Sequence, residues 1–215
     1  MRIILITGLL GSGKSTVLLS LAARLSKMEG PKAVVIIENE IGDTTLTSRC
    51  AGSFFADLSP VELDNNCICC TLTGELVGLL EDIQSRLNPS WLLVETSILA
   101  HQSIKDTIRQ TLITNEPLSV LVADAGRWSE MYREVPMLIG TQAERADFIL
   151  VNKIDTASPA ELETVLSDIG KLNPNRPVKT VNALEDDLNE FWDLVTEEAL
   201  KNGETSKENL KLAQI

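Results

Sequence analysis

Residues 8–16, near the start of the chain, read GLLGSGKST and fit the phosphate-binding pattern G-x-x-x-x-G-K-[ST] at every fixed position. Glycines let the loop curl so that successive backbone N–H groups point at phosphate oxygens, and the helix that follows adds its positive dipole end. Lys14 would reach the outer phosphates and the Ser15 hydroxyl would bind Mg²⁺. This fit favours a nucleotide site over a glycine-rich turn that binds nothing. The residues predicted to contact the phosphates are Gly8, Gly11, Ser12, Gly13, Lys14, Ser15 and Thr16.

A second motif, the tetrapeptide NKID, follows an apolar run and resembles the guanine-reading motif of P-loop GTPases. The Asp155 carboxylate would accept two N–H hydrogen bonds from guanine, and adenine lacks this pair of donors. Such a site would bind guanine nucleotides in strong preference to adenine nucleotides. Lys153 would lie across the base, while Asn152 would tie the loop together. Further along, Asn182 and Ala183 stand where such proteins place a second base-contacting loop. The pattern predicts GTP and GDP as the ligands.

Three of the four cysteines in the sequence are packed into the tetrapeptide CICC. In an extended segment residues two apart share a face, so Cys67 and Cys69 would converge on one ion, and Cys70 would supply a third thiolate. Thiolates prefer Zn²⁺, Cu(I) and similar metals to Mg²⁺ or Ca²⁺, which favours a transition-metal site. A redox pair and inert buried cysteines are the alternatives. Candidates for a fourth ligand are Glu40, Asp43, Cys50 and water.

Carboxylates follow two of the predicted strands, at the edge of the sheet where α/β proteins bind their ligands. Glu95 ends a buried apolar run and would hold Mg²⁺ through water. Glu40 and Asp43 lie in the acidic segment after the second strand, where they would support Mg²⁺, position the attacking water or bind another metal. An acidic loop in solvent and an ordinary strand-end acid are the simpler interpretations. The predicted catalytic residues are Lys14, Glu40, Asp43 and Glu95.

Apolar, β-branched runs recur along the chain with helical patterns between them. These runs predict the strands of a sheet that positions the motifs. The runs are almost continuously hydrophobic, which is typical of strands covered on both faces and therefore of a parallel sheet. Alternating strands and helices predict an α/β fold with a doubly wound, mostly parallel sheet of the P-loop NTPase type. The strands are predicted at residues 2–7, 33–38, 91–95, 118–123, 147–151 and 177–181.

The predicted helices have apolar stripes that would face the sheet. A capping box formed by Ser158 and Glu161 predicts the start of one helix, and Asp186 or Asp187 would cap the last one. His101, the only histidine in the sequence, is expected on a helix surface without a functional role. The apolar faces of two helices are predicted at Leu76, Leu79, Leu80, Ile83 and Leu87, and at Leu162, Val165, Leu166 and Ile169.

Length and composition indicate one domain that buries a core of its own, since the chain has 215 residues of which 44% are hydrophobic. We expect this domain to span residues 1–200, and the polar tail at 201–215 to be frayed or to dock as a short helix. A net charge of −12 argues against nucleic acid or an anionic membrane as the main partner. No run reaches the ~18 apolar residues of a membrane span, and no convincing cleavage site follows the first apolar run. A cytoplasmic location is therefore expected.

Together these residues resemble the CobW/HypB/UreG group of P-loop GTPases, and the CobW-like branch most closely. The cysteine motif is the specific feature, because ordinary GTPases lack it. The resemblance implies GTP binding and slow hydrolysis, coupled to delivery of Zn²⁺, Co²⁺ or Ni²⁺ or to insertion of a metal cofactor into a client enzyme. It implies a metal bound at Cys67, Cys69 and Cys70. The matching segments are residues 8–16, 38–40, 67–71, 95, 152–155 and 172–174.

The sequence departs from the family pattern in three places. Ile98 replaces the glycine that the family usually has three residues after Glu95, and a residue with a Cβ has less backbone freedom there. Asp43 stands where the family commonly has glutamate, which shortens a metal or water ligand. Many CobW-like proteins carry a second C-terminal domain and histidine-rich runs, which this sequence lacks. We therefore expect the GTPase domain only, acting for one particular metalloenzyme or corrinoid protein.

The main hypothesis is a GTP-hydrolysing metallochaperone or maturation factor for a metalloenzyme or corrinoid protein. Ser15 and Glu95 would hold Mg²⁺ and Glu40 or Asp43 would orient water, so hydrolysis would rest on positioning and be slow in the isolated domain. The resemblance also implies a homodimer that depends on nucleotide or metal. A nucleotide-dependent binding module that does not hydrolyse GTP, suggested by Ile98, is the second hypothesis. The third is a P-loop kinase of small molecules, against which the guanine motif and the cysteines argue.

Overall fold

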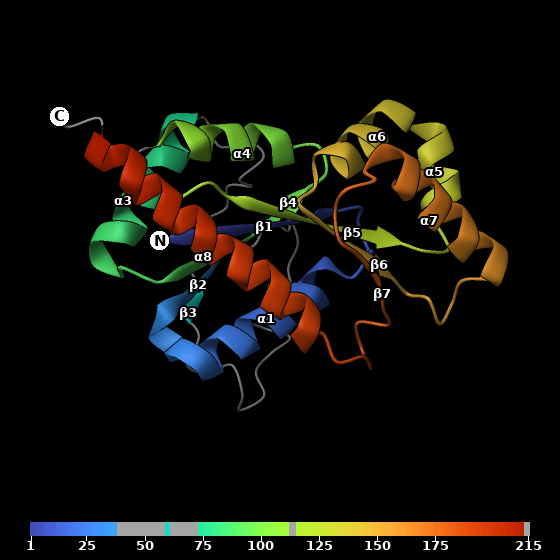
Figure 1. Ribbon diagram of the computed structural model, residues 1–215, viewed down its shortest axis with the longest axis horizontal. Helices are drawn as coiled ribbons and strands as arrows, with labels where there is room; N and C mark the ends of the chain where they lie inside the picture. Colours follow the sequence, from blue (N-terminus) through green and yellow to red (C-terminus); the bar gives the residue numbers. More distant parts are fainter. Residues whose placement is uncertain (38–58, 61–72, 112–114, 213–215) are drawn as a thin grey trace.

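The computed structural model describes residues 1–37, 59–60, 73–111 and 115–212, and it places them in an α/β fold around one parallel sheet (Figure 1). Within these residues the strand order is β3-β2-β4-β1-β5-β6-β7, and every neighbouring pair is parallel. Strand β1 therefore lies at the centre of the sheet, between β4 and β5. The strands are β1 (Arg2–Gly8), β2 (Val34–Ile37), β3 (Ser59–Pro60), β4 (Trp91–Ser97), β5 (Leu118–Asp124), β6 (Phe148–Asn152) and β7 (Val178–Thr180).

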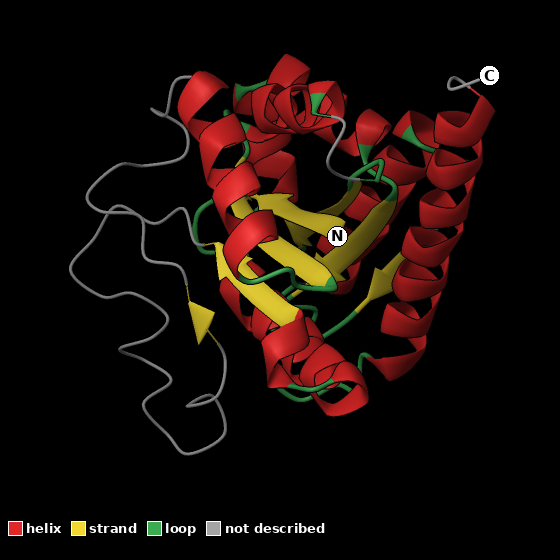
Figure 2. Ribbon diagram, turned by 90° about the vertical axis from the view of Figure 1, so that its left-hand side faces the viewer, coloured by secondary structure: helices red, strands yellow, loops and turns green. Residues whose placement is uncertain are grey.

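Helices cover both faces of this sheet (Figure 2). Helices α1 and α8 share one core cluster on one face, whereas α3 and α4 pack beside α5, α6 and α7 on the other. The sheet is thus doubly wound, as its sequence pattern predicts. The helices are α1 (Lys14–Glu29), the 3₁₀ turn η1 (Pro31–Ala33), α3 (Thr73–Arg86), α4 (His101–Gln110), α5 (Trp128–Glu134), α6 (Pro136–Arg145), α7 (Pro159–Leu172) and α8 (Asn189–Leu212).

The surroundings of strand β1 explain why its sequence is almost continuously apolar. Its side chains alternate between the two faces of the sheet, as in any strand. Ile4 and Ile6 enter the cluster beneath α1 and α8, while Ile3 and Leu5 enter the cluster beneath α3 and α4. All four side chains are almost completely buried. Both faces of the strand are therefore apolar along these four residues, which is the expected signature of a central strand in a parallel sheet.

The predicted fold class is confirmed, and each of the six predicted strands corresponds to an observed one with ends that differ by at most a few residues. Strand β3 is the one element of the described sheet that the pattern does not predict. It has only two residues, Ser59 and Pro60, which pair with β2. A pair of residues is too short to show any hydrophobic period, so its absence from the prediction has a simple cause.

The predicted helix caps are found, but two predicted inner-face residues are not. Ser158 and Glu161 form the complete capping box of α7, with each side chain bonded to the other's backbone N–H. Asp187 accepts a hydrogen bond from the backbone of Asn189 at the start of α8. Leu166 and Leu87 are 38% and 44% exposed, so the prediction is wrong there. Leu87 follows the last residue of α3, where the chain already turns away from the core.

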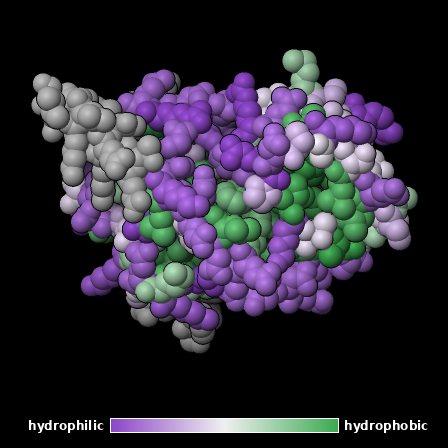
Figure 3. Space-filling model, in the orientation of Figure 1, coloured by the Kyte–Doolittle hydropathy of each residue, from purple (hydrophilic) through white to green (hydrophobic). Residues whose placement is uncertain are grey.

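Most of the surface seen in the orientation of Figure 1 is polar. Figure 3 shows hydrophilic side chains over most of the face drawn in Figure 1, with hydrophobic ones gathered in the gaps between helices. Helix α8 continues to Leu212, through most of the predicted tail, while the boundary between domain and tail stays a prediction. Across the described part of the chain, no helix combines the length and the apolar character that crossing a membrane requires.

Candidate functional site

The glycine-rich loop joins the end of the central strand β1 to the start of α1. Two of its glycines have positive φ angles where a side chain would also collide with the protein. A Cβ on Gly8 (φ +150°) would lie 2.3 Å from the Val122 carbonyl oxygen, and one on Gly13 (φ +99°) would lie 2.3 Å from Nδ2 of Asn152. These positions therefore require glycine for both conformation and space. The Ser12 hydroxyl in this loop is buried and has no hydrogen-bond partner among the described residues.

Lys14 and Ser15 both meet the carboxylate of Glu95. Strand β4 lies beside β1 in a register that pairs Ile6 with Glu95, which brings this carboxylate to the base of the loop. The Ser15 hydroxyl donates to Oε2 of Glu95 at 3.0 Å, and the Lys14 ammonium lies 3.5 Å from Oε1. The Lys14 ammonium also donates to the Leu9 carbonyl at 3.2 Å. With the Lys14 and Glu95 side chains 8% and 2% exposed, water screens this pair little.

Asn152, the last residue of β6, connects the glycine-rich loop to the loop that contains Ala183. Its side-chain Nδ2 donates to the Ser12 carbonyl at 2.8 Å, and its Oδ1 accepts from the backbone N–H of Ala183 at 2.9 Å. The side chain is buried, so both hydrogen bonds are shielded from water. The sequence predicts Asn152, Ala183 and the glycine-rich loop at one site, and the structure brings these three segments together.

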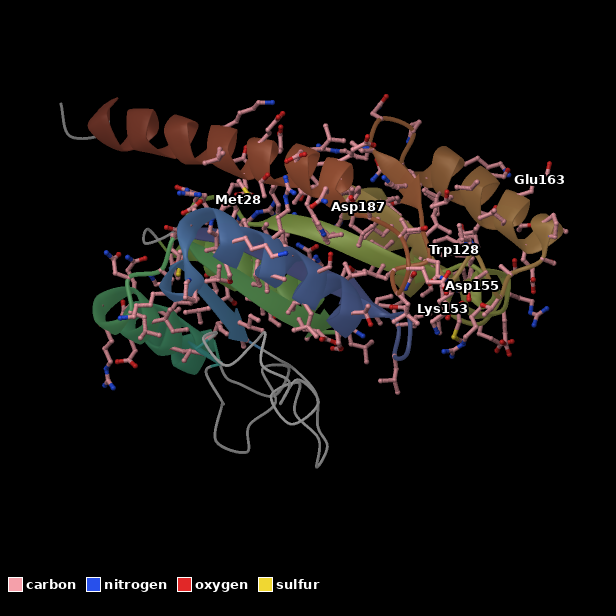
Figure 4. The ribbon with its side chains drawn as sticks, turned by 90° about the horizontal axis from the view of Figure 1, so that it is seen from below. Met28, Trp128, Lys153, Asp155, Glu163 and Asp187 are labelled. Carbon is pink, nitrogen blue, oxygen red and sulfur yellow. The ribbon has the colours of Figure 1, made fainter. Side chains whose placement is uncertain are left out.

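Lys153 and Asp155 lie next to each other on the loop that follows β6 (Figure 4). Lys153 has a positive φ of 61°, and its ammonium lies 3.0 Å from Oδ2 of Asp124. Asp155 is exposed, so its carboxylate is accessible to a ligand. Asn182 is half-buried beside Ala183, and its backbone N–H donates to Asp186. The edge of the sheet that holds the glycine-rich loop thus also presents the carboxylate of Asp155.

Asp124 and Arg127 are residues of this site that the sequence reasoning missed. Asp124 ends β5, is buried, and accepts a hydrogen bond from the Arg127 backbone in addition to the Lys153 ion pair. The Arg127 guanidinium donates to the Leu10 carbonyl at 3.1 Å, on the outer part of the glycine-rich loop. An acid at the end of an apolar strand is the signal that could have found Asp124. The residues that Asp124 contacts, however, could not be found in this way, because they depend on the strand order, which places β5 between β1 and β6.

Several predicted site residues lie outside the residues that the structure describes. They include all the predicted transition-metal ligands and the two acids that follow β2. In the described ranges, no group of three His, Cys, Asp or Glu side chains is arranged to hold a metal ion. The predicted residues outside the described ranges are Glu40, Asp43, Cys50, Cys67, Cys69 and Cys70.

Ile98, which replaces the glycine usual in the family, is anchored in the core. Its side chain is 8% exposed and belongs to the cluster that includes Trp128 and Ile139. Its carbonyl accepts a hydrogen bond of 3.1 Å from the buried side chain of Gln142 on α6. The turn that follows Glu95 is therefore fixed to α5 and α6 by both an apolar and a polar contact.

His101 is buried, so its expected position on a helix surface is wrong. The ring is 3% exposed and lies between two hydroxyl groups, with Nδ1 3.0 Å from Thr96 Oγ1 and Nε2 2.9 Å from Ser119 Oγ. Thr96 also donates to the Ile6 carbonyl at 3.4 Å. One arrangement uses every donor: Ser119 donates to Nε2, and Nδ1–H donates to Thr96. The sequence of the helix around His101 does not reveal these partners, because Thr96 belongs to β4 and Ser119 to β5.

The buried ring should make the stability of the protein depend on pH. Burial, and to a lesser extent the Lys105 ammonium, lowers the pKa of His101 to about 4, although Asp147 and Asp106 oppose this change. The unfolded chain binds the proton with a pKa of about 6.5, so lowering the pH below this value favours unfolding. Between about pH 7 and pH 4.5, we expect His101 to reduce the free energy of unfolding by about 2 kcal/mol.

Urea unfolding of the wild type and of His101→Asn at both pH values measures this difference. Carboxylates also titrate in this range, but they contribute equally to both proteins. The wild type should lose more stability than the variant on acidification. Equal losses would contradict a buried, neutral histidine.

The fold and the site define the class of the protein: an α/β nucleotide-binding protein of the P-loop NTPase type. Residues 2–180 match the nucleotide-binding domain of the CobW/HypB/UreG family. Because this match covers most of the chain, the protein belongs to the CobW/HypB/UreG family, and the predicted resemblance is confirmed.

Two curated relatives are similar along most of this chain. The zinc chaperone YjiA of Escherichia coli is 28% identical over 194 residues, which cover 86% of this chain and 58% of YjiA. The zinc-regulated GTPase metalloprotein activator 1 of Schizosaccharomyces pombe is 27% identical over 207 residues, which cover 88% of this chain and 48% of that protein. The chain thus spans about half the length of these relatives.

A solved structure supports the fold assignment. The hydrogenase maturation factor HypB from Archaeoglobus fulgidus superposes with a TM-score of 0.59, over 93% of this chain and 90% of that one. The two sequences are 13% identical over the superposition. At that identity the likeness establishes the architecture of the domain and says nothing more specific about its chemistry.

Proposed function

We propose that the protein is a GTP-binding, slowly hydrolysing metallochaperone or maturation factor that couples its nucleotide state to transition-metal binding. The observation that carries this proposal is the buried Asn152 bridge. A single side chain holds the Ser12 carbonyl of the glycine-rich loop and the backbone of Ala183, and it directly precedes the guanine-reading pair Lys153 and Asp155. Phosphate binding and base recognition would thus belong to one site.

Each residue near the loop has a role in this proposal. Backbone N–H groups and Lys14 would neutralise phosphate charge, and Asp155 would accept the guanine N–H groups. Ser15 and Glu95 present a hydroxyl and a carboxylate within hydrogen-bond distance of each other. Such hard oxygen donors suit Mg²⁺, which takes few protein ligands and keeps several waters. When bound, Mg²⁺ would neutralise charge that develops on the phosphates, and Glu40 or Asp43 would orient water.

The transition metal would be held at Cys67, Cys69 and Cys70, with Glu40 or Cys50 as a further ligand. We propose Zn²⁺ as the cargo, with Co²⁺ and Ni²⁺ as alternatives, because thiolates suit these ions and the curated relatives are named zinc chaperones. The recipient would be a client metalloenzyme or corrinoid protein in the cytoplasm. A homodimer that forms with nucleotide or metal belongs to the same proposal.

Zinc affinity that depends on the bound nucleotide tests this coupling. Competition with a chromophoric chelator gives the dissociation constant of Zn²⁺ for the chain alone, with GDP and with GTP. We expect the nucleotide state to change it by 1–3 kcal/mol, about 5- to 150-fold, which is typical of coupled sites. In Cys67→Ala the affinity should fall in every nucleotide state, whereas Lys14→Ala should keep zinc binding and lose only its nucleotide dependence. Equal affinities in all three states of the wild type would refute the coupling.

A GTP-binding module that does not hydrolyse its nucleotide is the second candidate, and the anchored Ile98 favours it. A turn held by the core and by Gln142 would move little when the γ-phosphate leaves, and such movement is how nucleotide switches report hydrolysis. Single-turnover phosphate release with zinc present separates the two candidates. Release above the buffer rate supports the GTPase, and none supports the module.

A further inference from the structure

A cation-lined pocket lies at the opposite edge of the sheet from the glycine-rich loop. Its cavity has a volume of about 330 Å³ and lies between α4, the end of α6 and the start of β7. Figure 1 shows α4 and α6 on the same side of the sheet. Asp147 and Arg176 lie just before β6 and β7, at their amino ends, whereas Asn152 ends β6 at its carboxyl end. The pocket is therefore distinct from the nucleotide site.

Cations outnumber acids among the side chains that line the pocket, although the whole chain carries a net charge of −12. Lys105, Arg109, Arg145 and Arg176 line it, against the acids Glu144 and Asp147. Arg109 is paired with Asp106 and Glu116, which lie outside the lining, whereas Lys105 and Arg176 share Asp147. A concave, partly buried site that is lined by cations attracts anions, because it focuses its field.

Asp147 organises the cations around one point. Its Oδ2 accepts hydrogen bonds from the Lys105 ammonium at 2.9 Å and from the Ser119 backbone N–H at 2.9 Å. Its Oδ1 lies 3.6 Å from the Arg176 guanidinium. The Lys105 side chain is 5% exposed, yet its ammonium makes one hydrogen bond among the described residues. Since an ammonium has three N–H donors, two of them remain for a ligand in a site where unpaired charge is costly.

The arginines have donors to spare as well. Arg145 makes no ion pair with any side chain among the described residues, and Arg176 reaches Asp147 with one nitrogen only. A guanidinium carries five N–H donors in a planar fork that matches carboxylate and phosphate oxygens. Arg109, by contrast, is already paired with Asp106 and Glu116. Lys105, Arg145 and Arg176 are thus the cations with free donors.

We propose that this pocket binds a small oxyanion, either a phosphate group or a dicarboxylate. The free N–H donors of Lys105, Arg145 and Arg176 suit the oxygens of such an anion, and the cavity is within the size of sites for small ligands. Lys105 and Arg176, which Asp147 holds in place, would donate to the anion, and Arg145 would cover it from α6. The anion site is separate from the nucleotide site of the proposed function.

Calorimetric titration of the full chain, saturated with GDP and Mg²⁺ so that the glycine-rich loop is occupied, tests the pocket. Inorganic phosphate and succinate are titrated separately. We expect one of them to bind with a stoichiometry of one, and to bind at least tenfold more weakly in the double variant Arg145→Gln/Arg176→Gln. The matched control is Arg86→Gln/Arg133→Gln, which removes two arginines whose side chains are 76% exposed. The control should bind the anion like the wild type.

Each outcome has one interpretation. Binding of phosphate alone identifies a phosphate group, and binding of succinate alone identifies a dicarboxylate. Binding of neither anion, or equal binding by the wild type and the Arg145/Arg176 variant, overturns the proposal. Because Arg145 and Arg176 are exposed, the variant should fold, which its thermal unfolding will show. Failure of the proposed function would appear separately, as absence of GDP binding in the same instrument.

Discussion

A chain that carries Asp155→Asn is expected to lose its preference for GTP and to bind xanthosine triphosphate (XTP) instead. Guanine offers two N–H donors side by side, and a carboxylate accepts both. Xanthine has an oxygen in place of the amino group, so it presents one donor and one acceptor. The amide of asparagine matches that pair, since it has one acceptor and one donor group. The exposed position of Asp155 leaves room for either base.

The change in the ratio of GTP to XTP affinity should be roughly 10⁴-fold, because a site built for specific hydrogen bonds rejects the ligand that leaves them unpaired. Displacement of a fluorescent GDP analogue by each triphosphate measures the ratio. Glu163→Gln is the matched control: it also removes one exposed carboxylate, on the outer side of α7 and away from Asp155 in Figure 4. This control should keep the wild-type ratio.

Two results would count against the role of Asp155. Retained GTP preference in Asp155→Asn would mean that another group reads the base. Loss of both triphosphates would mean that the substitution disturbs the loop after β6, and the capping box of Ser158 and Glu161 just beyond it would then be the place to look for damage.

Gly13→Ala is expected to destabilise the protein by about 4 kcal/mol and to remove nucleotide binding. The left-handed backbone at Gly13 costs a residue with a Cβ about 1–3 kcal/mol. The new methyl group would also displace the Asn152 amide, whose two hydrogen bonds serve the buried carbonyl of Ser12 and the N–H of Ala183. Leaving such groups unpaired costs about 1–3 kcal/mol each. The same displacement separates the phosphate loop from the base-contacting loops.

Urea unfolding and GDP titration measure the two effects. Gly170→Ala is the control, since Gly170 lies inside α7 and a Cβ there would meet no heavy atom within 4 Å. Alanine is the better helix former by about 1 kcal/mol, so this variant should be slightly more stable than the wild type. The glycine-to-alanine change is thus predicted to act with opposite sign at the two positions. Wild-type GDP affinity in Gly13→Ala would contradict the proposed role of the Asn152 bridge.

Much of the fold could be predicted because its strands are hydrophobic on both faces. In β1 and β6 every interior residue has a helix above or below it, so the pattern is local and strong. The prediction fails where the cause is not local. Leu166 has the spacing of an inner-face residue of α7 and is nevertheless exposed. Spacing alone does not show which residues of a helix its neighbours cover. The hydroxyl partners of His101 likewise cannot be predicted from the sequence of its own helix.

The candidate site shows the same division. Lys14, Ser15 and Asn152 belong to motifs that consist of neighbouring residues in the sequence, so they could be proposed from the sequence. Asp124 and Arg127 belong to no such motif. Their contacts with Lys153 and Leu10 arise from the position of β5 beside β1. Predicting them would require the strand order, which is a property of the whole sheet.

The position of β1 also determines when the glycine-rich loop becomes complete during protein synthesis. The loop leaves the ribosome before its partners, since its contact with Asn152 joins residues 140 positions apart. At ordinary rates of translation this separation corresponds to roughly 10–30 s. The contact from Thr96 to Ile6 already spans 90 residues. A nascent chain therefore carries an exposed, hydrophobic central strand until its neighbours arrive, and β1 needs protection from aggregation during that time.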